Sequence, residues 1–271
     1  MGKITLYILT HKKFDYSTIE EKQLYKPLLC GSACLNEDFG YICDDIGDNI
    51  SNLNKYYAEL TGEYWAWKND SSDIIGFCHY RRYFLNGIFN NVLSEKNLRK
   101  SLENHDIILP QKRYLNKTNI EEIKEGHFFN GVPQKEEDYD ILREIIKIES
   151  PDYLESFDNV LNENTVYWYN MFICRKELAD EYFQWMFNIL EIFCNQIDFS
   201  QYGDNKRILG YLSERLLNVF VKKHDLKIDE KYVVQTNIKI PFFNIIDNKF
   251  PVVQKFVKFL VKLKRKIKRC L

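Results

Sequence analysis

Residues 73–84 read DIIGFCHYRRYF and join an apolar segment to a polar one. The run 73–79 is short and mostly apolar, which is typical of a buried strand in a parallel sheet. His79, Arg81 and Arg82 lie where this strand ends. Ligands of open α/β sheets bind outside the carboxyl ends of the strands, so these side chains stand where a ligand is expected.

Strand-like and helix-like segments alternate along most of the chain. Residues 3–10 (KITLYILT) form a second buried strand that opens into Thr10, His11 and Lys12, and further strands are expected over 107–110 and 167–174. Apolar residues at helical spacing predict helices over 54–69, 95–104, 136–149, 151–161, 176–194 and 207–224. Residues 111–134 are polar and are expected to be irregular. This alternation predicts an α/β fold, a mixed and mostly parallel sheet flanked by helices.

The composition narrows the class of protein. With 45% hydrophobic and 28% charged residues and only 11 Gly and 6 Pro, the chain is neither disordered nor fibrous. Seven cysteines without a CxxC pair give neither a disulfide framework nor a zinc pattern. The sequence shows no signal peptide and no apolar run long enough to span a membrane, so we expect a cytoplasmic protein with reduced thiols.

Carboxylates gather in residues 44–49, DDIGDN, which we expect to form a loop. Asp44, Asp45 and Asp48 could hold Mn²⁺ or Mg²⁺ through hard oxygen ligands, or Asn49 and the aspartates could bind hydroxyl groups of a sugar or ribose. The alternative is an acidic turn in which Asp48 or Asn49 caps the next helix. Spacing alone leaves both interpretations open.

The Arg81–Arg82 pair suits a diphosphate, because guanidinium groups donate paired N–H bonds in a fixed geometry. The alternative is a set of structural ion pairs with the many acidic side chains. Neighbouring residues of an extended strand point to opposite sides, so only one of the two arginines is expected to face a ligand. His79 is either structural or part of the same cluster.

Two further polar residues interrupt apolar segments. Asn170 lies inside the expected strand 167–174, and its buried amide needs either backbone groups or a ligand hydroxyl as partners. Glu214 stands near the start of an amphipathic helix, where it could be the general base that deprotonates an acceptor hydroxyl. It could equally pair with Arg207 or Arg215.

The C-terminal segment differs in charge from the rest of the chain. Nine basic residues and no acidic one lie from Lys249 onward, which leaves 29 basic against 39 acidic residues before it. Val253, Phe256, Leu260 and other apolar residues recur at helical spacing between the lysines. We therefore divide the chain into a body, residues 1–247, and a basic amphipathic tail, residues 248–271, that docks on an anionic membrane surface. A helix packed on the body and an RNA-binding tail are the alternatives; RNA binding does not need the apolar face.

Several motifs together resemble one family of bacterial capsular and exopolysaccharide glycosyltransferases, long known as a domain of unknown function and in part assigned as galactofuranosyltransferases. The likeness extends over about residues 3–225. Its most specific stretches are HYRRYF at 79–84 and YWAWKN at 64–69, and it also includes ILTHK, DDxGDNIS, ELT, NMFI and SERLL.

The resemblance implies a GT-A-like fold and transfer of a hexosyl group, galactose or galactofuranose in type, from a UDP-sugar to a lipid-linked oligosaccharide. It implies that the donor site is lined by Thr10, His11, Lys12, Asp44, Asp45, Asp48, Asn49, His79, Arg81 and Arg82. The acceptor would be a polyprenyl-diphosphate oligosaccharide at the inner face of the cell membrane, with the enzyme peripheral to it. No Asp-x-Asp metal motif ends the second strand, so arginine could neutralise the leaving diphosphate in place of a cation. In the family, the region 111–134 faces the acceptor; here it holds His127, Phe128 and Phe129.

Together these inferences predict a glycosyltransferase. Glu214 is the first candidate for its catalytic base, and Asp48 or Asp45 is the second. A non-catalytic, membrane-docked scaffold of a polysaccharide assembly complex is the alternative function. A nucleic-acid-processing enzyme is disfavoured, because the body is acidic and the net charge of the chain is −1.

Overall fold

The central strand of the sheet is β1 (Ile4–Thr10), and all seven of its residues are buried. This computed structural model describes residues 2–236 except 18, 36, 88–90, 126–133 and 204–205. The expected tail 248–271, the boundary at residue 247 and the aromatic pair after His127 lie outside the described residues.

The sheet is mixed and mostly parallel, as predicted. β1 pairs in parallel with β4 (Ile74–His79) on one side and β2 (Tyr25–Leu29) on the other, and β2 pairs in parallel with β3 (Ile42–Cys43). Beyond β4, β9 runs antiparallel to both its neighbours, and β6 pairs in parallel with β10; their bounds are Ile173–Arg175, Ile107–Pro110 and Ile228–Lys231. The parallel strands β1, β2, β3 and β4 bring their carboxyl ends to one edge.

Short antiparallel strands extend the sheet beside the functional region. β5 (Arg82–Phe84) turns back from β4 and pairs with β11 (Val233–Gln235). A separate two-stranded ribbon joins β7 (Arg113–Tyr114) to β8 (Thr165–Val166). Because β4 and β6 both run antiparallel to β9, they run in the same direction, and the chain leaves both strands at the same edge of the sheet.

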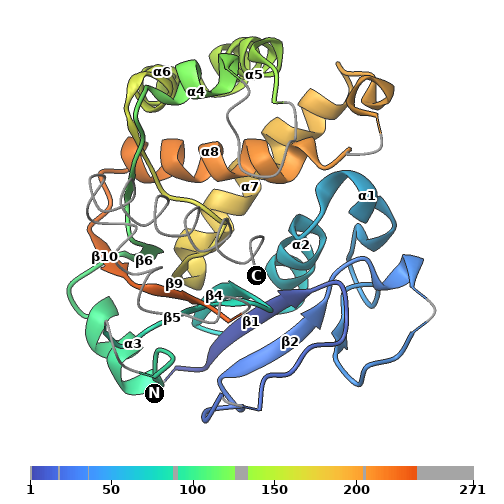
Figure 1. Cartoon of the computed structure of the whole chain (residues 1–271), viewed down its shortest axis with the longest axis vertical. Helices are drawn as coiled ribbons and strands as arrows, with labels where there is room; N and C mark the ends of the chain where they lie inside the picture. The colour runs from blue at the N-terminus through green and yellow to red at the C-terminus, as the bar shows by residue number, and fades with distance from the viewer. Residues whose placement is uncertain are drawn as a thin grey trace, which may run out of the picture.

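Helices cover both faces of the sheet (Figure 1). Along β1, Leu6 and Ile8 pack into one apolar cluster with α3 (Glu95–Leu102), whereas Tyr7 and Leu9 pack into the other. The second cluster includes buried residues of α2 (Leu60–Asn69), α7 (Lys176–Cys194) and α8 (Ile208–Lys223). A further layer packs on these helices, formed by α4 (Asn119–Lys124), α5 (Glu136–Glu149) and α6 (Leu154–Asn162). Alternate residues of a strand point to opposite faces, and both faces of β1 are covered, which explains why it is buried throughout.

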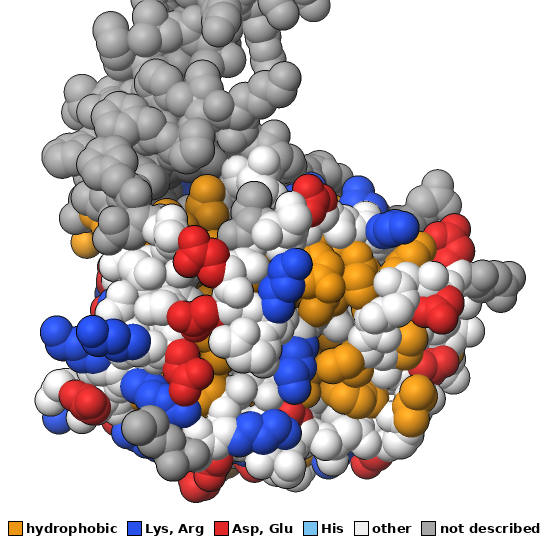
Figure 2. All heavy atoms as spheres, turned by 90° about the horizontal axis from the view of Figure 1, so that it is seen from below, with side chains coloured by type: hydrophobic (Ala, Val, Ile, Leu, Met, Phe, Trp, Pro, Cys, Tyr) orange, Lys and Arg blue, Asp and Glu red, His pale blue; other side chains and the backbone are white. Residues whose placement is uncertain are grey.

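The surface mixes apolar and basic groups on one face. Figure 2 shows hydrophobic side chains gathered on the face seen from below, with Lys and Arg side chains next to them. Within the part of the chain that the structure describes, no helix is long and apolar enough to cross a bilayer.

The predicted strands at 3–10, 73–79 and 107–110 and the helices at 95–104, 136–149, 176–194 and 207–224 are confirmed to within a few residues. The helix predicted over 54–69 is broken into α1 (Asn54–Tyr57) and α2, because Ala58 adopts a positive φ of 53°. Asn54 stabilises this break through its Nδ2 atom, which donates to the Ala58 carbonyl at 2.6 Å and to Thr61 Oγ1 at 3.0 Å.

Two expectations about secondary structure were wrong. Of the strand predicted over 167–174, only the last two residues belong to a strand, β9 (Ile173–Arg175); residues 169–170 form a turn and the others have no regular secondary structure. The supposedly irregular region 111–134 contains α4, whose start is fixed by a capping box between Thr118 and Glu121. Periodicity failed in the first case because buried turns are as apolar as strands, and in the second because α4 is short.

We predict that Gly76→Ala destabilises the protein. Gly76 lies in β4 opposite Leu6 and Ile173, and a Cβ atom there would lie 2.6 Å from a side-chain carbon of each. Overpacking of this kind costs about 1–3 kcal/mol. The matched control is Gly210→Ala in α8, where the nearest atoms would lie at 3.7 Å. Denaturant unfolding measures both, and equal stability of the two variants would contradict the packing described.

Candidate functional site

The carboxyl ends of β1 and β4 are side by side, with Leu9 opposite His79 in the register. Thr10 ends β1 and is buried. Its Oγ1 atom donates to the Lys12 carbonyl at 2.7 Å and accepts from the Lys12 N–H at 3.2 Å. Thr10 therefore shapes the loop that presents His11 and Lys12, a positioning contribution rather than an open binding group.

Three basic side chains surround the Tyr80 ring. Lys12 Nζ lies 5.1 Å and the Arg81 guanidinium carbon 5.4 Å from its centroid, and the His11 ring packs edge-on at 5.4 Å. Loss of part of its solvent shell, together with the charges of Lys12 and Arg207, lowers the pKa of His11. The ends of these two strands thus combine into one basic rim, part of the rim of opposite charges that the sequence predicted.

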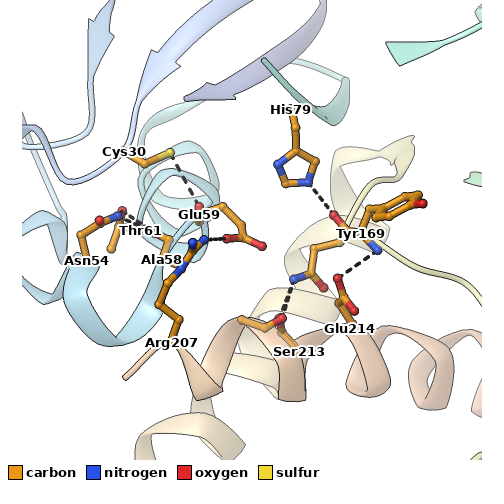
Figure 3. A network of polar contacts seen from close by, with 12 residues as sticks. Cys30, Asn54, Ala58, Glu59, Thr61, His79, Tyr169, Arg207, Ser213 and Glu214 are labelled. Carbon is orange, nitrogen blue, oxygen red and sulfur yellow. Dashed lines mark hydrogen bonds and ion pairs between the residues drawn. The ribbon is translucent and has the colours of Figure 1, made fainter. Parts of the chain in front are cut away.

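His79 joins β4 to a turn that precedes β9. Its Nε2 atom lies 2.6 Å from the Tyr169 carbonyl oxygen, and the ring is buried (Figure 3). Burial lowers the pKa of His79, although the Glu59 carboxylate opposes this shift. The ring donates through Nε2 to the carbonyl, and the structure therefore gives His79 a positioning contact between β4 and the turn.

The turn at Tyr169 and Asn170 is conformationally strained. Both residues have positive φ angles, 88° and 50°, which non-glycine residues rarely adopt. The Asn170 Nδ2 atom donates to the Gly210 carbonyl at 2.9 Å and to Ser213 Oγ at 2.8 Å. Asn170 is 1% exposed, so it anchors the turn to α8 instead of facing a donor as the sequence suggested.

Glu214 caps the same turn from α8. Its Oε1 atom accepts the Tyr169 backbone N–H at 3.1 Å (Figure 3). Burial raises the pKa of Glu214 to about 7; Arg215 and Arg82 act against this rise and Glu59 adds to it. A carboxylate with a pKa near neutrality is suited to exchange protons with a substrate.

Glu59 is the acidic residue that sequence reasoning missed. It precedes α2, and its carboxylate accepts from Arg207 Nη2 at 3.1 Å with 19% of the side chain exposed. Burial favours the neutral form, but the charges of His79 and Arg207 outweigh it and the pKa of Glu59 is lowered. A continuous helix over 54–69 would have placed Glu59 in its interior. The break at Ala58 instead places Glu59 at the start of α2.

Arg81 and Arg82 separate onto different rings, as expected for neighbours in an extended segment. The Arg82 guanidinium carbon lies 4.3 Å from the Tyr169 ring centroid, whereas Arg81 packs on Tyr80. Burial lowers the pKa of Arg82, and its Nε atom is buried with no hydrogen-bond partner within the described residues. Arg82 is therefore a positive group that the folded chain leaves incompletely satisfied.

The acidic loop 44–49 serves two separate purposes. Asp44 is fully buried and accepts from the backbone N–H groups of Gly31 and Ser32 and from the hydroxyls of Ser32 and Ser51 at 2.5–3.0 Å. Its oxygens hold the loops after β2 and β3 together. A cation at Asp44 would have to displace these donors, so this residue does not fit a metal site.

Asp48 and Asn49 lie along α2, away from Glu59. Asp48 accepts from Tyr64 at 3.3 Å, and its backbone carbonyl accepts from Asn69 at 2.7 Å. Asn69 ends α2, and a ten-residue helix is about 15 Å long, so Asp48 is roughly that far from the residue before its start. Asn49 donates to the carbonyls of Asp45 and Gly47, which closes the loop on itself.

The expected meeting of opposite charges at one rim therefore takes a different form. The acids that interact with His79 and Arg82 are Glu59 and Glu214, not the residues of loop 44–49. Asp45 and Asp48 are exposed. Within the described residues, no three His, Cys, Asp or Glu side chains converge as a metal-binding group.

Comparison with known proteins places this geometry in a family. A family model described as "Domain of unknown function (DUF4422)" matches residues 5–225. The apo structure of the bifunctional glycosyltransferase WbbM is similar, with a TM-score of 0.76 and 27% sequence identity over 87% of this chain. This chain spans 46% of the length of that one, about half. No curated protein matches the sequence. The GT-A-like fold expected from the sequence is confirmed.

We predict that Glu214→Gln makes the protein more stable than wild type at pH 8. The unfolded chain loses the Glu214 proton near pH ~4.3, whereas the folded chain keeps it until about pH 7, so the wild type loses stability as the pH rises through this window. The expected gain is about 1–3 kcal/mol at pH 8 and close to zero at pH 4. Urea unfolding at both pH values measures it; the same difference at both would show that burial does not hold the proton on Glu214.

Proposed function

We propose that this chain, which belongs to the DUF4422 family, is a glycosyltransferase that moves a hexosyl group from a UDP-sugar to a lipid-linked oligosaccharide. Glu214 supports this proposal most directly. It is a carboxylate with a pKa of about 7, held by the strained turn at Tyr169 and within electrostatic reach of Arg82 and Glu59. The fold it shares with a glycosyltransferase gives the arrangement its context.

The basic rim at Tyr80 is suited to the diphosphate of the donor. Lys12 and Arg81 flank one ring and His11 packs on its edge, so the rim can supply two fixed charges and a neutral donor. Developing charge on a departing diphosphate is stabilised best by groups that are already in place. Arginine and lysine are thus the proposed counterions; none of the aspartates supplies a fitting metal site.

Aromatic rings continue from this rim and offer a surface for the base of a nucleotide. Phe14 lies 6.1 Å from Tyr80, 5.4 Å from Tyr16 and 5.6 Å from Tyr41 between ring centroids. These four rings are partly buried. A flat base can stack on such rings whatever hydrogen-bonding groups its edges carry.

The chemistry is a single displacement or its front-side variant. The acceptor oxygen bonds to the anomeric carbon while the bond from that carbon to the UDP oxygen breaks, and the electron pair leaves with UDP. Glu214 takes the proton of the acceptor hydroxyl. Glu59 is a weaker base because Arg207 and His79 lower its pKa. Asp48 and Asp45 are exposed on the loop along α2, so we rank them after Glu214.

The biological setting remains part of the proposal. Donor sugars of the galactose or galactofuranose type and a role in capsular or exopolysaccharide synthesis come from the sequence resemblance alone. A polyprenyl-diphosphate acceptor would be reached at the inner membrane surface, with the basic tail 248–271 as the docking segment. A non-catalytic scaffold is the competing function, and nucleotide binding distinguishes the two.

We predict that UDP stabilises the folded protein, by about 2.7 kcal/mol at one hundred times its Kd. Lys12→Ala and Arg81→Ala should each weaken UDP binding at least tenfold, because each removes one charge from the rim. Lys100→Ala on α3 is the control for loss of an exposed charge. Denaturant unfolding with and without UDP gives the result, and a wild type that UDP leaves unchanged would favour the scaffold.

We predict that kcat/KM for sugar transfer falls tenfold per pH unit below about pH 7, where Glu214 becomes protonated. Glu214→Gln should lower kcat by a factor of about 10² to 10⁴ and abolish this limb of the pH profile. Glu163→Gln, which removes a surface ion pair with Lys222, is the control and should retain both. UDP release in the presence of a lipid-linked acceptor mixture is the assay. A limb that persists in Glu214→Gln would assign the proton to another group.

A further inference from the structure

A second basic group gathers on the ring of Tyr169, in the strained turn. Arg82 and Arg113 both contact the Tyr169 ring, at 4.3 and 5.7 Å from its centroid, and Arg113 Nη2 donates to the Tyr169 hydroxyl at 2.9 Å. These arginines come from β5 and β7, whereas the Tyr80 rim comes from the ends of β1 and β4. The neighbours Arg81 and Arg82 are thus divided between two cationic sites.

A pocket opens at this second group. Its lining includes Arg82, Arg113, Gln111, Trp168 and Tyr169. The Arg82 Nε atom and the Gln111 Oε1 atom are both buried without a hydrogen-bond partner in the described part of the chain. The Arg82 atom is a charged donor and the Gln111 atom is an acceptor. Together they suit a ligand that carries both an oxyanion and a hydroxyl group.

Among the described residues, no carboxylate forms a direct ion pair with the two arginines of the pocket, Arg82 and Arg113. Burying a guanidinium group without a counterion is costly, and a bound oxyanion would offset that cost through charge-assisted hydrogen bonds. Tyr169 holds both arginines in place, which gives the site fixed geometry before a ligand arrives.

Glu214 lies beside the second cationic group. It accepts the backbone N–H of Tyr169, whose ring carries the second group, and it interacts electrostatically with Arg82. A base that takes the acceptor proton must be next to the acceptor. The group around Tyr80 is then left for the donor and the group around Tyr169 for the other substrate.

We propose that the pocket of Arg82, Arg113 and Gln111 binds an oxyanion of the acceptor, either the diphosphate of a lipid carrier or the carboxylate of an acidic sugar. This inference rests on the proposed transferase function and deepens it, because it makes the acceptor an anionic molecule. Gln111 Oε1 accepts a hydroxyl of the same molecule, and the arginines fix its orientation relative to Glu214. A neutral glycan would leave both guanidinium groups unpaired.

The test measures binding of farnesyl diphosphate, glucuronate and the neutral octyl glucoside to the full chain, with UDP held saturating so that the donor site is filled. We expect one of the two anions to bind and octyl glucoside to bind more weakly by at least tenfold. Arg113→Gln should weaken binding of that anion at least tenfold, with the UDP Kd changed less than twofold. Arg113→Lys should have an intermediate effect, because lysine keeps the charge but not the fork, and Lys100→Gln should have none.

The outcomes separate the two proposals. Selective loss for farnesyl diphosphate identifies the carrier diphosphate as the ligand, and selective loss for glucuronate identifies an acidic sugar. Unchanged anion binding in Arg113→Gln overturns the inference, and so does an equal loss of UDP binding, which would make the pocket part of the donor site. If the wild type binds no UDP but Arg113→Gln still loses the anion, the anion site stands and the transferase function fails.

Discussion

The contact between His79 Nε2 and the Tyr169 carbonyl, 2.6 Å long, is the constraint on which the site depends. It ties the end of a central parallel strand to a turn with two consecutive positive φ angles. Such a turn costs free energy and persists only where surrounding groups fix it. Here His79 of β4 holds the turn at 2.6 Å, and α8 holds it through Glu214 at 3.1 Å and through the bonds of Asn170 at 2.8–2.9 Å.

The turn at Tyr169 and Asn170 also positions the charged side chains of the site. The Tyr169 backbone N–H holds Glu214, and the Tyr169 ring contacts both Arg82 and Arg113. A half-buried carboxylate and a half-buried guanidinium near each other could have neutralised one another completely. They do not, because the pKa of Glu214 stays raised and Arg82 Nε keeps no partner among the described residues. The site therefore contains a carboxylate that can accept a proton, Glu214, and a positive group, Arg82, that can pair with a ligand.

The acidic loop 44–49 shows how one motif can be divided by folding. Four donors around Asp44 make it a structural element that joins the loops after β2 and β3. Asp48 and Asn49, only a few residues later, pack along α2 instead. Clustering in sequence therefore did not produce clustering at the rim, because the buried donors fix Asp44 while the rest of the loop folds onto α2.

The sequence by itself determined the class of fold and placed basic side chains at the ends of two strands, and it offered Glu214 as a candidate base. The apolar runs at 3–10 and 73–79 predict parallel strands, and the carboxyl ends of parallel strands share an edge. Lys12 and Arg81, which follow these ends, are therefore expected at the same edge. Glu214 could be singled out because it interrupts an amphipathic helix.

Tertiary structure alone decided which acids join this rim and how the arginines are divided. Glu59 enters the site because Ala58 breaks a helix that periodicity predicts as continuous. Arg82 and Arg113, 31 positions apart, meet on Tyr169 because β5, β7 and the turn before β9 converge in space. Contacts between such distant segments depend on how the layers pack, and no local pattern of residues encodes that packing.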